Sequence, residues 1–164
     1  MEEQVQLVDE LGRPCGSAPR SVMRSQNLRH AATGILVTNS AGQVYVHRRT
    51  DTKDVYPGRY DFAAGGVLDV DEEPLAGATR ELAEELGITG VPLEPLGEGD
   101  FRDDNADFHA WLYRVTWDGP MVHQASEVAW GGWMTVDEVR EMIADPARPV
   151  MPDSVALWDL AGLA

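Results

Sequence analysis

The strands and helices that the sequence predicts follow one another in the order of a mixed α/β (α+β) protein. Three observations indicate this class. Residues 30–38 and 43–47 form two β-like runs around a turn, an amphipathic helical segment occupies the middle of the chain, and both kinds of pattern return after it. A chain of 164 residues is long enough to bury a core, and we expect a single domain over residues 1–164.

The first third of the chain is expected to form a hairpin, a short helix and two strands. Residues 4–8 alternate polar and apolar side chains and lead into a turn at 9–12, which predicts the start of a hairpin. Residues 17–26 read as a short helix with a proline near its start. The runs at 30–38 and 43–47 are separated by a turn at 39–42, which is typical of paired strands.

The segment between Pro74 and Gly87 is predicted to be a helix of about three turns. Pro74 suits the first turn, where the missing N–H of proline removes no hydrogen bond. Gly87 follows the last periodic residue and suits a C-cap. One apolar stripe recurs at helical spacing and should face a sheet; it consists of Leu75, Ala78, Leu82 and Leu86.

The rest of the chain reads as three more strands and two helices. Residues 91–101 and 107–117 are expected to be antiparallel strands joined by an acidic turn, and 128–134 a further strand. A helix should run from 135 to about 144, because Thr135 and Glu138 have the spacing of a capping box. Residues 154–163 are expected to close the chain as a helix.

Three glutamates of the central helix, Glu81, Glu84 and Glu85, should lie on adjoining faces. The rise from Glu81 to Glu85 is about 6 Å. Carboxylates this close repel one another and weaken the helix unless a cation lies among them. Mg²⁺ or Mn²⁺, which are hard ions with oxygen ligands, would suit the cluster. Arg80, four residues before Glu84, is placed to neutralise part of its charge.

The same region carries a longer pattern of fixed residues. The pattern is G-x5-E-x7-R-E-U-x-E-E-x-G-U, where U is aliphatic, and every position is filled by Gly66, Glu72, Arg80, Glu81, Leu82, Glu84, Glu85, Gly87 and Ile88. This segment resembles the signature of the Nudix hydrolase family. The resemblance implies a mixed β-sheet between helices, an α/β/α sandwich, which agrees with the predicted order of elements.

The resemblance also implies an activity. It implies a hydrolase that cleaves a phosphoanhydride bond of a nucleoside di- or triphosphate, or of a nucleoside diphosphate derivative. Mg²⁺ or Mn²⁺ would neutralise the phosphate oxygens and lower the pKa of an attacking water. The implied metal ligands are Glu81, Glu84 and Glu85 with the carbonyl of Gly66, and the catalytic carboxylates include Glu84 and Glu85. Glu72 is expected to pair with Arg80 as a structural brace.

Four further residues are candidates around this segment. Glu127 lies where relatives often supply another carboxylate, so it is either a fourth ligand or general base or an ordinary surface residue. Gly65 would let the backbone approach the substrate closely. Arg48 and Arg49 end a predicted strand and could grip a phosphate, or pair instead with the acidic residues of the central helix. A base could stack on one of three aromatic side chains: Tyr60, Phe62 or Trp130.

Two rival functions use the same fold. The regions before the glycine pair also resemble isopentenyl-diphosphate isomerases and a related set of bacterial Nudix hydrolases. Those isomerases carry a catalytic cysteine and a histidine where this chain has Gly65 and Val67, which argues against isomerisation. A non-catalytic nucleotide-binding module is the other rival. Such modules commonly lose the acidic residues of the signature, and this chain retains them.

The composition limits the classes of molecule that the protein is expected to bind and the compartment that suits it. A net charge of −15 without a basic run argues against binding of long nucleic acids, although bound cations would still admit a small nucleotide or diphosphate substrate. The sequence contains no apolar run of membrane-spanning length, and its start at residues 1–3 is acidic rather than basic. A single cysteine, Cys15, suits a reducing cytoplasm. The resemblance leaves a homodimer open.

Overall fold

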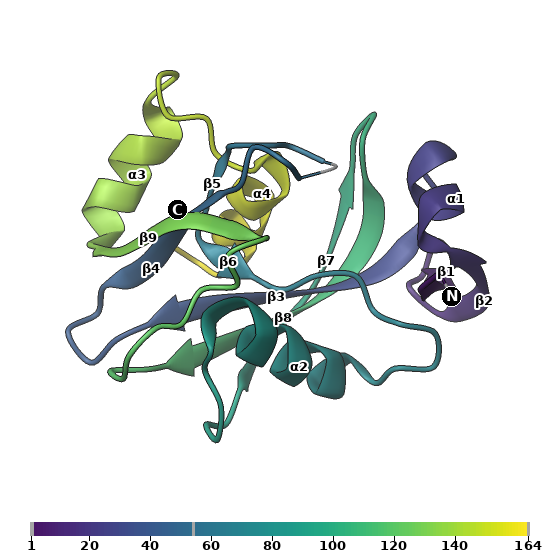
Figure 1. The fold of residues 1–164 in the computed structure, drawn as a ribbon, viewed down its shortest axis with the longest axis horizontal. Helices are drawn as coiled ribbons and strands as arrows, with labels where there is room; N and C mark the ends of the chain where they lie inside the picture. The colour runs from purple at the N-terminus through teal and green to yellow at the C-terminus, as the bar shows by residue number, and fades with distance from the viewer. Residues whose placement is uncertain (1, 54, 164) are drawn as a thin grey trace.

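The fold is a mixed, curled β-sheet with helices on both faces (Figure 1). The structure, a computed structural model, describes residues 2–53 and 55–163, so Met1 of the predicted acidic start lies outside the described residues. The strands are β1 Gln4–Val8, β2 Pro14–Pro19, β3 His30–Thr38, β4 Val44–Arg49, β5 Tyr60–Asp61, β6 Ala63–Ala64, β7 Glu94–Arg102, β8 Asp107–Thr116 and β9 Val128–Met134. The helices are α1 Arg20–Ser25, α2 Pro74–Leu86, α3 Val136–Ala144 and α4 Pro152–Leu160.

Strand β3 organises the sheet. It is buried over nearly its whole length and pairs in parallel with β8, from His30 opposite Phe108 to Thr38 opposite Thr116. On its other side β3 contacts β4 and the short strand β6, both antiparallel. Strands β7 and β9 extend the sheet as antiparallel partners of β8 and β4. Near-continuous burial of β3 is what a strand covered on both faces requires.

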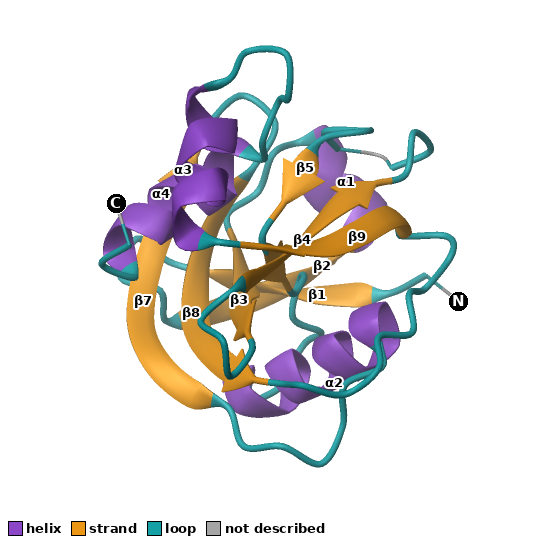
Figure 2. Ribbon diagram, turned by 90° about the vertical axis from the view of Figure 1, so that its left-hand side faces the viewer, coloured by secondary structure: helices purple, strands orange, loops and turns teal. Residues whose placement is uncertain are grey.

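Two cores lie on opposite faces of the sheet (Figure 2). Ile35 and Val37 of β3 point to one face, which α2 covers, whereas Leu36 between them points to the face covered by α3 and α4. This alternation follows from the two-residue period of a strand. The α/β/α sandwich implied by the sequence is therefore confirmed.

Helix α2 has the bounds and the cap that its sequence predicts. Gly87 adopts the left-handed conformation with φ of 70°, and its N–H donates to the carbonyl of Ala83. Three positions of the predicted apolar stripe, Ala78, Leu82 and Leu86, are buried. Leu75 is an exception: it lies in the first turn of α2 and is 52% exposed.

The N-terminal prediction was partly wrong. Residues 17–19 belong to strand β2, which pairs with β1, and α1 begins only at Arg20. Pro19 has no N–H to donate to a neighbouring strand, and β2 ends at this residue. Helix α1 starts at the next residue. Strand β1 bridges from Val5 to Asp69 in the loop that precedes α2, and Met23 of α1 packs in one cluster with Val5 and with Val67 of that loop.

The C-terminal elements match the prediction apart from their ends. Helix α3 has the expected capping box: Thr135 accepts from the N–H of Glu138, and Glu138 accepts from the N–H of Thr135. Helix α4 begins at Pro152 and ends at Leu160 rather than spanning 154–163, and β7 begins at Glu94 rather than at 91. Within the described ranges, none of the helices combines the length and apolarity needed to span a bilayer. The single domain, the homodimer and the cytoplasmic location stay predictions.

Candidate functional site

The polar side of α2 borders a cavity of about 480 Å³, which we call the outer compartment. Glu81, Glu84 and Glu85 line it, and Gly65 and Gly66 contribute their backbone. The predicted acidic cluster therefore faces a space large enough for a substrate. The apolar side of the same helix packs on the sheet, which fixes the direction in which the three carboxylates point.

A bidentate ion pair links α2 to the loop before it. The guanidinium of Arg80 donates through Nε to Oε2 of Glu72 at 2.8 Å and through the second terminal nitrogen to Oε1 at 2.9 Å. Oε1 of Glu72 also accepts from the N–H of Asp69 at 3.1 Å. The other terminal nitrogen of Arg80 reaches Glu81 at 3.0 Å and Glu84 at 3.4 Å. Arg80 thus holds the loop and shares its charge with two of the cluster glutamates.

Glu85 is held from two sides. Oε2 accepts from the N–H of Gly65 at 3.2 Å, and Oε1 lies 3.4 Å from Nε2 of His47. His47 of β4 is only 1% exposed. Burial lowers the pKa of His47, but the contact with Glu85 and the charges of Asp61 and Glu85 outweigh burial and raise that pKa. Sequence reasoning missed His47, because an isolated histidine inside a β-like run carries no local signal.

Glu81 and Glu84 differ in their surroundings. Burial, with the charges of Glu85 and Glu84 opposing the relief from Arg80, raises the pKa of Glu81 to about 7. The side chain of Glu84 is 51% exposed and contacts Arg80 at 3.4 Å. Among the described residues, no three acidic, histidine or cysteine side chains converge into a ready-made metal site. The donors nevertheless fit a hard divalent cation, because they are carboxylate oxygens whose mutual repulsion such an ion would relieve.

The glycine pair is shaped by close backbone contacts. Gly65 has φ of +137°, and a Cβ built there would lie 2.2 Å from the carbonyl oxygen of Thr33. A Cβ on Gly66 would lie 2.9 Å from the carboxylate of Glu81. The carbonyl of Gly66, an expected metal ligand, accepts a hydrogen bond from the N–H of Thr33 at 2.9 Å. The structure therefore joins Gly66 to β3 while leaving room for Glu81.

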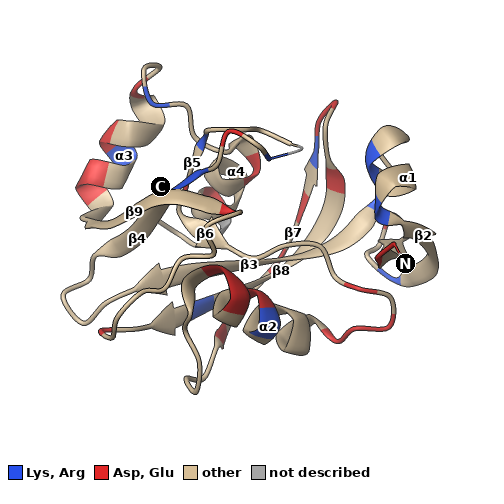
Figure 3. Ribbon diagram, viewed as in Figure 1, with Lys and Arg blue, Asp and Glu red and all other residues tan. Residues whose placement is uncertain are grey.

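Basic side chains from outside α2 also line the outer compartment, and we call them the basic wall. In the described part of the chain they are Arg20, Arg24, Arg49 and Lys53; Arg80 lines the cavity from α2 itself, and Glu3 and Glu127 line it as well. Figure 3 shows the blue segments of α1 and the red and blue segments of α2 from which several of them come. The sequence shows no basic patch, because these residues are scattered between positions 20 and 80 and meet only after folding.

The two arginines at the end of β4 have different places. Arg49 lines the outer compartment, and one terminal nitrogen donates to the carbonyl of Val55 at 2.9 Å. Arg48 binds the loop that follows its strand: Nε donates to the carbonyl of Gly58 at 3.1 Å, and a terminal nitrogen lies 3.0 Å from Asp51. Arg48 is not among the described residues that line either compartment.

Glu127 also lines the outer compartment. Its carboxylate pairs with the ammonium of Lys53, and its backbone carbonyl accepts from the N–H of Thr50. The loop after β4 and the loop before β9 are therefore tied together at the mouth of the cavity. The loop of Glu127 is also joined to α2, because the N–H of Gln124 donates to the carbonyl of Glu85 at 3.1 Å and the N–H of Glu127 donates to the carbonyl of Gln124 at 2.9 Å.

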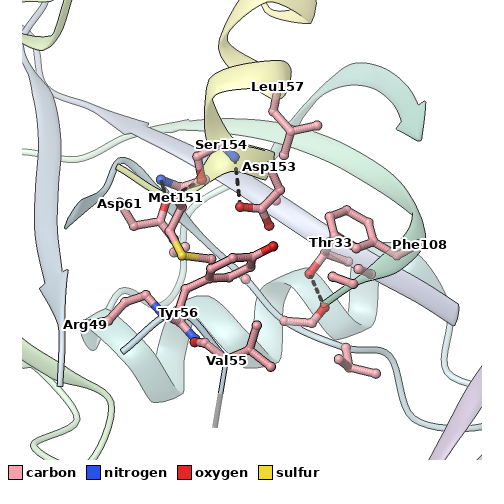
Figure 4. A pocket seen from close by; sticks show the side chains of 18 of the residues that line it. Thr33, Arg49, Val55, Tyr56, Asp61, Phe108, Met151, Asp153, Ser154 and Leu157 are labelled. Carbon is pink, nitrogen blue, oxygen red and sulfur yellow. Dashed lines mark hydrogen bonds between the residues drawn. The ribbon is translucent and has the colours of Figure 1, made fainter. Parts of the chain in front are cut away.

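A second cavity of about 110 Å³, the inner compartment, adjoins the outer one (Figure 4). Arg24, Arg49 and residues 65–67 line both. The walls of the inner compartment include Thr33 of β3, Phe108 of β8 and the ring of Tyr56, whose hydroxyl donates to Asp103. Asp153, in the first turn of α4, points its carboxylate into it.

The aromatic residues proposed for stacking on a base lie elsewhere. Phe62 is 2% exposed and packs edge-on against Trp158 in the core under α3 and α4. Tyr60 and Trp130 pack against each other with ring centroids 6.2 Å apart. The aromatic side chains that line the inner compartment are instead Tyr56 and Phe108, which come from a loop and from a strand distant in sequence.

Stability should depend on pH through Asp153. Burial, followed by the charge of Asp61, raises the pKa of Asp153 from 3.8 to about 7. A carboxyl whose folded pKa is raised contributes stability that is fully present below about pH 4 and is lost as the pH rises through about 7. The free energy of unfolding of Asp153→Asn, relative to that of the unchanged protein, should therefore be higher at pH 8 than at pH 5. The expected increase is on the order of 1–2 kcal/mol.

Urea unfolding midpoints at the two pH values measure this gain. Asp159→Asn is the matched control, because Asp159 is exposed on the same helix. A stability difference between Asp153→Asn and the unchanged protein that is equal at pH 5 and pH 8 would contradict the prediction.

The sequence matches a family model and relatives that carry the same family description. The family model described as the NUDIX domain matches residues 28–154. The chain is 43% identical over 166 residues to a protein of Rhodococcus erythropolis described as the uncharacterized Nudix hydrolase orf19. That match covers 95% of this chain and 90% of the relative.

Solved structures of the same fold agree with this match. The crystal structure of DR0079 from Deinococcus radiodurans has a TM-score of 0.75 at 23% identity, with 98% of both chains covered. The NUDIX domain of Shewanella oneidensis NrtR, in a cocrystal structure with ADP ribose, has a TM-score of 0.63 at 16% identity. The latter covers 88% of this chain and 97% of that one.

Proposed function

Because the chain belongs to the Nudix hydrolase family, we propose that it cleaves a phosphoanhydride bond with the help of Mg²⁺ or Mn²⁺. The proposed substrate is a nucleoside di- or triphosphate or a nucleoside diphosphate derivative. One observation carries the proposal: the three glutamates of α2 and the basic wall line a single cavity. Carboxylates suit the cations, and the basic wall suits phosphate oxygens beyond their reach.

The proposed division of labour follows from how each carboxylate is held. Glu81, Glu84 and Glu85 would hold the cation, which neutralises phosphate charge and makes a water molecule more acidic when bound. Glu85 is anchored by Gly65 and His47, whereas Glu84 is exposed and, among the described side chains, contacts only Arg80. The Glu72–Arg80 pair would brace the loop that carries Gly66. Arg49 would bind phosphate, and Arg48 would support the adjoining loop.

The reaction needs one proton acceptor. The oxygen of water attacks a phosphorus atom, the bridging P–O bond breaks, and the proton released by water passes to a carboxylate. Glu84 and Glu127 suit this role, because both line the cavity and retain some exposure. The products would be a nucleoside monophosphate with phosphate, pyrophosphate or the other phosphorylated half of the substrate.

The structural neighbour bound to ADP ribose supports a nucleotide-containing ligand for this fold. The inner compartment adjoins the outer one and would hold the non-phosphate part of such a ligand, with the phosphates in the outer compartment. A second cavity of this kind is not required for inorganic phosphate or pyrophosphate alone.

A screen of nucleoside phosphates and diphosphate conjugates with Mg²⁺ or Mn²⁺ tests the proposal, with products identified by mass. We expect turnover that disappears in EDTA and returns with excess cation. Hydrolysis in isotopically labelled water would show which phosphorus receives the new oxygen. Substrate binding without chelator-sensitive turnover would instead indicate a nucleotide-binding module. Conversion of isopentenyl diphosphate to its allylic isomer would indicate an isomerase.

A further inference from the structure

Alternate side chains of strand β4 face α2 and the outer compartment. Tyr45, His47 and Arg49 share one face of the strand, because side chains two residues apart point the same way. Arg49 lines the outer compartment, and His47 contacts Glu85. Tyr45 is 5% exposed and belongs to the core cluster between the sheet and α2. Its ring therefore lies on the same side of the sheet as the acidic cluster.

The segment between β8 and β9, residues 117–127, runs past the C-terminal end of α2; we call it the β8–β9 loop. The N–H of Val122 donates to the carbonyl of Leu86 at 3.0 Å. Two residues further on, the N–H of Gln124 donates to the carbonyl of Glu85 at 3.1 Å. The loop then lines the outer compartment with Gln124, Ser126 and Glu127. Its position along α2 therefore decides where these side chains stand in the cavity.

His123 joins the β8–β9 loop to the sheet through Tyr45. The hydroxyl of Tyr45 and Nε2 of His123 form a hydrogen bond, and the centroids of the two rings are 5.8 Å apart. Burial raises the pKa of Tyr45, so the hydroxyl keeps its proton and donates. Burial, followed by the charge of His47, lowers the pKa of His123, so the ring is neutral at pH 7 and Nε2 accepts.

Strand β9 leaves room for this hydrogen bond. A Cβ built on Gly131 would lie 2.2 Å from the hydroxyl oxygen of Tyr45 and 2.7 Å from Nε2 of His123. The ring of Tyr45 also packs edge-on against Trp133 of β9, with centroids 5.1 Å apart. The hydrogen bond thus lies between β4, β9 and the β8–β9 loop, and a side chain at position 131 would displace it.

We propose that the Tyr45–His123 hydrogen bond holds the β8–β9 loop where Glu127 lines the outer compartment, so that Tyr45 and His123 are positioning residues for hydrolysis. The inference rests on the proposed function, in which Glu127 is a candidate proton acceptor. Glu127 lies four residues after His123, and its N–H donates to the carbonyl of Gln124 at 2.9 Å. A shift of the loop would therefore move the carboxylate, and a misplacement of about 1 Å can slow a reaction by about 100-fold.

Hydrogen exchange tests the holding role without turnover. Tyr45→Phe removes the hydroxyl and keeps the ring that packs on Trp133. The amides of Val122 and Gln124 should then exchange about 10-fold faster, because the loop can open without breaking the Tyr45–His123 hydrogen bond. His123→Ala should have the same effect. His123→Gln, whose amide oxygen can replace Nε2 as the acceptor, should stay within about threefold of the unchanged protein.

Tyr113→Phe is the matched control for the loss of a buried hydroxyl. Tyr113 belongs to the same core cluster, and its hydroxyl forms no hydrogen bond with any residue that the structure describes. Exchange in the β8–β9 loop should change by less than about twofold in this variant. Unfolding curves show that each variant is folded. Unchanged exchange of the loop amides in both Tyr45→Phe and His123→Ala would overturn the inference.

Steady-state kinetics on a substrate found in the nucleotide screen test the consequence for catalysis. Tyr45→Phe and His123→Ala should each lower kcat about 5- to 30-fold and change KM by less than about threefold. His123→Gln should keep kcat within about threefold of the unchanged value. In Glu127→Gln, the further substitution Tyr45→Phe should lower kcat by less than about twofold, because the carboxylate that the loop positions is already lost. The same fold-loss from Tyr45→Phe with and without Glu127→Gln would contradict positioning through Glu127.

The two measurements separate this inference from the proposed function. Chelator-sensitive hydrolysis that Tyr45→Phe and His123→Ala both retain in full would reject the inference and keep the function. Faster exchange of the loop in these variants, without hydrolysis of any nucleotide in the screen, would reject the function and keep the holding role of the hydrogen bond.

Discussion

Glu85→Gln is expected to lower kcat by about 10²- to 10⁴-fold while leaving the fold intact. Glutamine has the size of glutamate, and its side-chain oxygen can still accept from the N–H of Gly65. It lacks the negative charge that a divalent cation needs and that His47 contacts at 3.4 Å. Glu84→Gln should lower kcat in the same range, although Glu84 is more exposed and makes fewer contacts.

Steady-state kinetics on a substrate found in the nucleotide screen measure this loss. Glu141→Gln is the matched control, because Glu141 is exposed on α3 and far in the fold from α2. Thermal unfolding shows that each variant is folded, and a metal titration shows whether excess cation restores part of the rate. Unchanged turnover in both Glu84→Gln and Glu85→Gln would remove the catalytic assignment.

Gly65→Ala should cause the largest loss of stability among substitutions near the site. A side chain is strained at φ of +137°, and the added Cβ would lie 2.2 Å from a backbone carbonyl oxygen that no rotamer change can move. We expect a loss of about 3–5 kcal/mol in the free energy of unfolding. Activity should fall as well, because displacement of this segment breaks the hydrogen bond from Gly65 to Glu85.

Gly97→Ala separates strain from steric clash. Gly97 of β7 has φ of +136°, almost the value at Gly65, but nothing lies within 4 Å of a Cβ built there. Gly97→Ala should therefore carry the conformational strain alone, about 1–2 kcal/mol. Denaturant unfolding of both variants compares the two. If Gly65→Ala lost no more stability than Gly97→Ala, the close approach to Thr33 would not matter for the fold.

The local elements were predictable from the chain because their signals lie within a few residues. The bounds of α2 follow from Pro74, the helical spacing of its apolar residues and Gly87. The capping box identified the start of α3 in the same way. The errors came where local preferences competed: residues 17–19 have few features that separate a strand end from a helix start, and pairing with β1 decided the outcome.

The sequence by itself determined the family and the sandwich of helices around a mixed sheet. It also determined that three glutamates cluster on one helix, since helical geometry places them together in any fold. Tertiary structure decided what faces those glutamates. Arg20, Lys53 and Asp153 line the two compartments from α1, a loop and α4, and His47 of β4 contacts Glu85. Parallel pairing of β3 with β8 brings Thr33 and Phe108 to one wall. Contacts between residues so distant along the chain depend on the packing of whole layers, which no local pattern of residues encodes.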